Sequence, residues 1–138
     1  MVARGDGGLL FTSSIAATMP EPFQSTYAAS KAFLLSFAEA LRVELEDDGV
    51  VVTALMPGPT ETNFFERAGI EDTRLGQMDK DDPVDVARDG VDALLAGKDK
   101  VVAGSMKNRA QAVTARVVPD SLKAKVHGKL TEPGSGTG

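Results

Sequence analysis

A pattern of strand, long helix and strand fills the first 56 residues and constrains the fold more than any other feature. The run GLLFTSS at 8–14 and the β-branched, uncharged run VVVTALM at 50–56 both predict buried strands, because their apolar residues continue without alternation. Between them, residues 26–47 predict a helix, with Ser25 or Thr26 as its cap. Such a unit implies a right-handed parallel crossover, so we expect an α/β fold.

The remaining chain predicts shorter elements with clear start and stop signals. In chain order we expect a helical piece at 62–68, a helix at 83–97, a strand at 100–103, and helices at 105–117 and 120–130. Pro83 suits the first turn of its helix, Asp81 or Asp82 can cap it, and Gly97 closes it. Its apolar stripe is expected to comprise Val84, Ala87, Val91, Leu94 and Leu95.

Three side chains with proton-transfer chemistry are expected to meet at one edge of the sheet. Ser14 follows the first strand, and the carboxyl ends of parallel strands are where ligands bind in open α/β sheets. Tyr27 and Lys31 are four residues apart, so they share one helix face. Each also has an ordinary explanation, since a tyrosine and a lysine often occur at this spacing and Ser13 and Ser14 can simply bond nearby backbone. The ordered combination favours a catalytic site.

These residues resemble the active-site segment of the short-chain dehydrogenase/reductase family. In that family a serine ends a central strand and Tyr-x-x-x-Lys opens the following long helix. The stretch PGPTET at 57–62 is similar to the family's Pro-Gly-x-x-x-Thr loop. The resemblance covers about residues 8–104 and implies a Rossmann-like, three-layer parallel sheet.

The motifs expected upstream of the serine are absent, so the chain resembles only the carboxyl-terminal half of such an enzyme. Gly5, Gly7 and Gly8 do not fit the G-x-G-x-x-G spacing that holds a cofactor diphosphate, and they precede a strand instead of opening a helix. We expect residues 1–118 to form a partial Rossmann-like catalytic domain and residues 119–138 a C-terminal helix with a flexible tail.

The resemblance also implies the role of each site residue. Tyr27 would exchange a proton with the substrate oxygen, Lys31 would lower the Tyr27 pKa and hold the nicotinamide ribose, and Ser14 would hydrogen-bond the substrate carbonyl. The catalytic set is therefore Ser14, Tyr27 and Lys31, and the expected contacts to NAD or NADP are Tyr27, Lys31, Pro57, Gly58, Thr60 and Thr62. The choice between the two cofactors is set outside this chain.

Composition narrows the partners. The net charge is −5 and the 15 basic residues form no dense run, which argues against nucleic-acid binding. No apolar run approaches the roughly 18 residues that span a membrane. Without cysteine and with His127 as the single histidine, which we expect at the surface, no metal site is expected. We expect a cytoplasmic homo-oligomer, with Phe33 and Phe37 off the sheet-facing side of their helix. The family resemblance implies a small carbonyl or alcohol substrate.

Three functional interpretations stay open from the sequence. The first is a dehydrogenase/reductase present as a fragment, and the second is a catalytically inactive remnant that serves as a dimerisation or interaction module. The third is a small-ligand-binding domain that uses the same strand edge. Phe64 and Phe65 fit either simple anchors or the walls of a substrate pocket.

Overall fold

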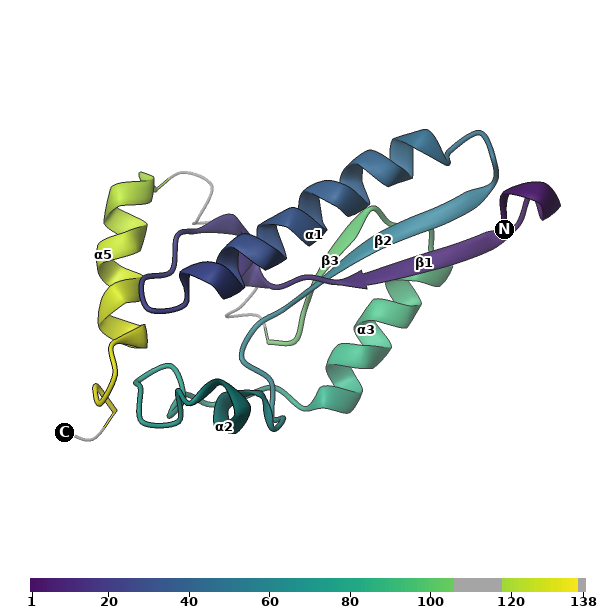
Figure 1. Cartoon of the computed structure of the whole chain (residues 1–138). Helices are drawn as coiled ribbons and strands as arrows, with labels where there is room; N and C mark the ends of the chain where they lie inside the picture. The colour runs from purple at the N-terminus through teal and green to yellow at the C-terminus, as the bar shows by residue number, and fades with distance from the viewer. Residues whose placement is uncertain (106–117, 137–138) are drawn as a thin grey trace.

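The computed structural model describes residues 1–105 and 118–136, and its centre is a three-stranded parallel sheet (Figure 1). The strands are β1 (Gly7–Thr12), β2 (Val50–Pro57) and β3 (Lys100–Ala103), in the order β1-β2-β3. Leu9 pairs with Val52, and Leu55 pairs with Val101. The expected parallel α/β sheet is confirmed, with strand bounds within two residues of the prediction.

Two helices cover opposite faces of this sheet and complete the three layers (Figure 1). Helix α1 (Ser25–Glu44) lies on the face where Val52 and Ala54 form a core with Ala38. Helix α3 (Pro83–Leu95) lies on the other face, where Val86 packs with Leu55. Alternate residues of β2 therefore serve two separate cores, which explains why its sequence is apolar throughout.

The ends of α1 differ from the prediction. The residue at the amino-terminal cap is Gln24, and its side chain makes no capping hydrogen bond. Ser25 is already the first helical residue, so the assignment of Ser25 or Thr26 as the cap was wrong. At the other end the helix stops at Glu44, three residues early, and a series of turns leads to Gly49 at a φ of 66°.

Helix α3 begins as expected and presents a different face to the sheet. The Asp82 carboxylate accepts a hydrogen bond of 2.7 Å from the Val84 backbone N–H, and Pro83 follows in the first turn. The predicted apolar stripe was wrong in part: Val84, Val91 and Leu95 are exposed, and the buried positions are Val86, Gly90 and Ala93. A Cβ atom at Gly90 would lie 2.9 Å from Leu55 Cδ2, so small size matters more here than hydrophobicity.

The other elements are short and surround the carboxyl edge of the sheet or its opposite end. They are the 3₁₀ helices η1 (Val2–Arg4) and η2 (Ile15–Thr18), and the α-helices α2 (Phe64–Ala68) and α5 (Asp120–Thr131). Helix α5 confirms the helix expected at 120–130, whereas the helix expected at 105–117 falls mainly outside the described residues. No helix in the described ranges is both long and apolar enough to cross a membrane.

The segment after α5 is attached to a distant part of the chain. The backbone N–H of Gly136 donates to the Asp72 carbonyl at 2.7 Å, and the Gly134 N–H donates to the Asp72 carboxylate at 2.9 Å. These bonds tie residues 132–136 to the loop before α3. The division of the chain at residues 118 and 119 stays a prediction.

Candidate active site

The carboxyl edge of the sheet opens into a cavity of about 370 Å³ that brings together every site residue expected from the sequence. Its lining includes the expected catalytic side chains Ser14, Tyr27 and Lys31. The loop after β2 contributes the expected cofactor contacts, namely Pro57, Gly58, Thr60 and Thr62. Residues separated by almost fifty positions meet because parallel strands end at the same edge.

The two adjacent serines after β1 have different surroundings. The Ser14 hydroxyl accepts a hydrogen bond of 3.1 Å from the Ala16 N–H and donates over a long 3.4 Å to the Pro57 carbonyl. The Ser13 hydroxyl donates at 2.8 Å to the backbone carbonyl of Lys31. Ser13 thus joins β1 to α1, while Ser14 lies in the cavity lining with a weakly held hydroxyl hydrogen.

The Lys31 ammonium lies close to the Tyr27 ring and is hydrogen-bonded to the backbone. Its Nζ is 5.6 Å from the centre of the Tyr27 ring and donates to the Thr12 carbonyl at 3.0 Å. Burial lowers the pKa of Lys31, because desolvation disfavours the charged ammonium. Helix α1 therefore delivers both side chains to one wall of the cavity.

The pKa of Tyr27 moves in the direction opposite to the one that the resemblance implies. Burial raises the pKa of the phenol above its usual value, a hydrogen bond with Ser14 offsets part of this rise, and the charge of Glu21 adds to it. The Lys31 ammonium, directed at the Thr12 carbonyl, is not a cause of the shift. In this structure the phenol is held in its neutral, proton-carrying form.

The threonines of the loop after β2 form hydrogen bonds with the nearby backbone. The Thr60 hydroxyl donates to the Gly58 carbonyl at 3.0 Å, and the Thr62 hydroxyl accepts from the Phe64 N–H at 3.3 Å. Thr60 also forms an isolated parallel bridge with Asp81. The Thr62 bond reaches the first residue of α2, so the loop and the start of this helix are joined along one side of the cavity.

Aromatic side chains wall the cavity next to the tyrosine. The rings of Tyr27 and Phe64 have centroids 5.0 Å apart, and Phe64 lies 5.4 Å from Phe65 at nearly a right angle. Both phenylalanines belong to the cavity lining. Of the two interpretations left open for them, the wall of a pocket describes their position.

Two ionisable residues of the cavity were missed or misplaced by the sequence reasoning. Glu21, in the loop between η2 and α1, was not considered, and His127 of α5 was expected at the surface. Both line the cavity, and only 12% of the His127 side chain is exposed, so the surface assignment was wrong. The one available signal was the spacing of Lys123, His127 and Thr131, which places them on one face of a helix.

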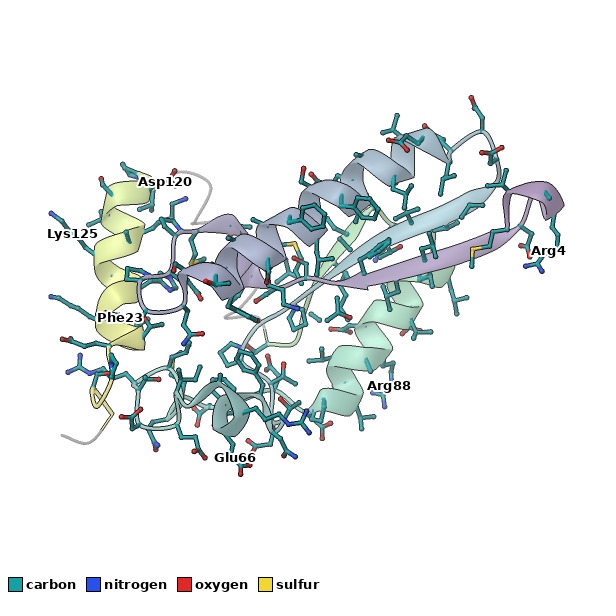
Figure 2. All side chains as sticks on the ribbon, in the orientation of Figure 1. Arg4, Phe23, Glu66, Arg88, Asp120 and Lys125 are labelled. Carbon is teal, nitrogen blue, oxygen red and sulfur yellow. The ribbon has the colours of Figure 1, made fainter. Side chains whose placement is uncertain are left out.

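Helix α5 reaches the cavity because it is bonded to two loops far away in sequence. The buried Thr131 hydroxyl donates to the Pro22 carbonyl at 2.7 Å, and the Leu130 carbonyl accepts from the Leu75 N–H at 2.9 Å. Figure 2 labels Phe23, the neighbour of Pro22, next to this helix. Phe23 has a φ of 64°, which is unusual for a bulky residue and turns the chain sharply between η2 and α1.

No cluster of three or more metal-ligating side chains occurs within residues 1–105 and 118–136. The polar side chains that line the cavity carry hydroxyls, a phenol, an ammonium, a carboxyl and an imidazole, and the other walls are largely apolar.

Known proteins resemble this chain in sequence and in fold. The family model for short chain dehydrogenases matches residues 1–72. The dehydrogenase/reductase SDR family member 7B of Danio rerio is 38% identical over 108 residues, which cover 74% of this chain and 35% of that protein. A short-chain dehydrogenase from Streptomyces avermitilis is 25% identical, with a TM-score of 0.69 over 91% of this chain and 51% of its own.

A further solved structure adds a bound cofactor. It is a short chain dehydrogenase from Burkholderia cenocepacia in complex with NADP, 26% identical, with a TM-score of 0.63 over 81% of this chain and 49% of its own. The chain thus spans about a third of the zebrafish relative and about half of the two solved relatives. With the family model matching more than half of its residues, this chain belongs to the short chain dehydrogenase family.

Proposed function

We propose that this chain supplies the catalytic half of an NAD(P)-dependent oxidoreductase that interconverts alcohols and ketones. The observation that carries the proposal is the meeting of Ser14, Tyr27 and Lys31 at one largely apolar cavity on the carboxyl edge of the sheet. The NADP bound to the Burkholderia cenocepacia relative supports the choice of cofactor.

The residues present fit a nicotinamide nucleotide on the side of Lys31 and the loop after β2. The Lys31 ammonium has three N–H groups, and the described residues accept one of them, at the Thr12 carbonyl. The others are available to ribose hydroxyls, and the loop from Pro57 to Thr62 would lie along the nicotinamide. When bound, the cofactor supplies or accepts the hydride.

The side chains of this chain would manage the substrate oxygen and its proton. The Ser14 hydroxyl can turn from its long bond with the Pro57 carbonyl and donate to the substrate carbonyl oxygen. The Tyr27 phenol, held neutral by burial, is a proton donor to the same oxygen during reduction. The phenolate left behind would draw the Lys31 ammonium toward it, since two unit charges about 4 Å apart attract by about 4 kcal/mol at an effective dielectric of about 20.

A second candidate is an interaction module without catalysis. Phe33 is 66% exposed and Phe37 44% exposed on one side of α1, and their rings stack at 5.9 Å. Among the described residues β1 pairs only with β2, so its other edge is open. Apolar surface and an open edge of this kind favour association with another chain or another part of the same protein.

The test is a substitution of the single tyrosine. The chain is joined behind the amino-terminal half of a solved short chain dehydrogenase, and NADPH-dependent reduction of a panel of ketones is measured. Tyr27→Phe is expected to abolish reduction and to leave NADPH binding intact, because only the proton-carrying oxygen is removed. Lys31→Ala is expected to weaken both.

Controls separate chemistry from folding. NADPH fluorescence measures binding for each variant, and the 138-residue chain alone is expected to show no turnover because its sequence has no glycine-rich diphosphate motif. Full reduction by Tyr27→Phe would refute the catalytic proposal. An assembled protein that binds the cofactor and reduces no ketone would favour the interaction module.

A further inference from the structure

The cavity is lined by a second pair of polar side chains, Glu21 and His127, besides Ser14 and Tyr27. Glu21 comes from the loop after η2 and His127 from α5, and both line the same cavity as Tyr27. Glu21 is 8% exposed and the His127 side chain 12% exposed. Much of the neighbouring lining is apolar, with Leu75, Met78 and Leu130.

The polar side-chain atoms of Glu21 and His127 lack hydrogen-bond partners among the described residues. His127 Nδ1 is fully buried and forms no hydrogen bond, and no described group donates to the Glu21 carboxyl oxygens. His127 Nδ1 and Glu21 Oε1 are 3.7 Å apart, which is too long for a direct hydrogen bond. Because buried polar groups are costly when unpaired, the pair is suited to receive a group from outside the chain.

The protonation states of Glu21 and His127 determine which kind of ligand group fits between them. Burial raises the pKa of Glu21 to about 7 and lowers the pKa of His127, so near neutral pH the imidazole does not supply a full positive charge to the carboxyl. The nearby Lys123 ammonium is bonded to the Thr18 carbonyl and the Asp120 carboxylate. A neutral ligand group that both donates and accepts a hydrogen bond matches this pair best.

We propose that Glu21 and His127 bind a hydroxyl group of the substrate other than the one that reacts. An alcohol hydroxyl can donate to one member of the pair and accept from the other, whereas a ketone oxygen only accepts and an ammonium only donates. The substrate class is then a largely apolar ketone that carries a separate hydroxyl, or the corresponding diol. This inference rests on the proposed oxidoreductase function, since the same cavity holds the reacting oxygen.

The single histidine of the chain makes the pair directly observable. His127 gives the only imidazole signals in an NMR spectrum of the 138-residue chain. Hexyl methyl ketone and its analogue with a hydroxyl on the terminal carbon are titrated separately. The hydroxylated ketone is expected to bind about tenfold more tightly, as one or two net hydrogen bonds provide, and to shift the His127 signals.

Two substitutions test whether the preference comes from this pair. Glu21→Leu and His127→Phe each replace a polar partner by an apolar side chain of similar size, and each is expected to reduce the tenfold preference to near equality. Glu44→Leu, at an exposed position of α1, is the matched control and is expected to keep the preference. Because the comparison of the two ketones is made first on the unaltered chain, a variant that does not fold leaves the test intact.

The outcomes separate this inference from the proposed function. Equal affinity of the unaltered chain for the two ketones, unresponsive His127 signals, or a preference that survives both substitutions would overturn the second hydroxyl site. A preference that depends on Glu21 and His127 supports the site even where the assembled protein transfers no hydride. In that case the proposed oxidoreductase function fails alone.

Discussion

Replacing Glu21 by glutamine is expected to stabilise the protein at neutral and alkaline pH. The carboxyl group is buried, and burial raises its pKa from the usual 4.5 to about 7. At about 1.4 kcal/mol per pH unit, this rise corresponds to at most about 3 kcal/mol of unfolding free energy. Glutamine keeps the shape of the side chain and cannot ionise, so it removes this cost.

The pH window follows from which state binds the proton more tightly. Below about pH 4.5 both the folded and the unfolded states carry a protonated Glu21, so no penalty exists. Between 4.5 and about 7 the unfolded chain loses the proton first, and the free energy of unfolding falls as pH rises. Above about pH 7 Glu21 is ionised in both states, so the decrease in the free energy of unfolding is complete and no longer changes with pH. His127 acts in the opposite sense, because its lowered pKa reduces stability as pH falls through 6.5.

Urea unfolding followed by circular dichroism, at a series of pH values from about 4 to about 8, measures the effect. The unaltered chain and Glu21→Gln are compared at each pH, and since both contain His127, their difference is expected to isolate the contribution of Glu21. Glu44→Gln, which removes an exposed carboxylate near the end of α1, controls for the change in net charge. A difference between the unaltered chain and Glu21→Gln that does not grow between pH 4.5 and 7 would refute the reasoning.

Three further predictions concern the active site and the surface. The phenolate absorbance of Tyr27, the single tyrosine, is expected to titrate above the usual pKa of 10.0 in the 138-residue chain, and a lower value would contradict its burial. In the assembled protein Ser14→Ala is expected to lower kcat, through the loss of about 2–4 kcal/mol of transition-state stabilisation. Steady-state kinetics measure this change, and an unchanged kcat would count against a role for the serine. Sedimentation at micromolar concentration is expected to show self-association that the double substitution Phe33→Ser with Phe37→Ser weakens, and a clean monomer of the unaltered chain would argue against it.

The sequence predicted the parts of the fold that depend on local pattern. The three strands were visible because runs such as VVVTALM are apolar on both faces, and Asp82 with Pro83 is a strong helix-start signal. The buried face of α3 was predicted only in part, because a hydropathy pattern does not reveal that Gly90 lies against Leu55 or that Val91 is exposed. Tertiary packing determines which face of α3 is buried.

The sequence predicted the part of the candidate site that β1 and α1 supply, and it did not predict the part that contains Glu21 and His127. The order and spacing of Ser14, Tyr27 and Lys31 predicted that they meet at the sheet edge, and all three line the cavity there. His127 was not predicted there, because its position depends on the bonds that hold α5 against loops more than fifty residues away, such as the one from Leu75 to Leu130. Glu21 carries no sequence signal at all, since a glutamate between two prolines ordinarily marks an exposed loop.

The attachment of α5 to the loop before α1 also sets the order in which the cavity can form. The bond from Thr131 to Pro22 spans 109 residues, and that from Lys123 to Thr18 spans 105. Contacts so distant in sequence require a large loop to close, and during synthesis they cannot form before α5 has left the ribosome. The sheet and α1 can therefore assemble early with the tyrosine already in position, while the wall that carries His127 arrives last.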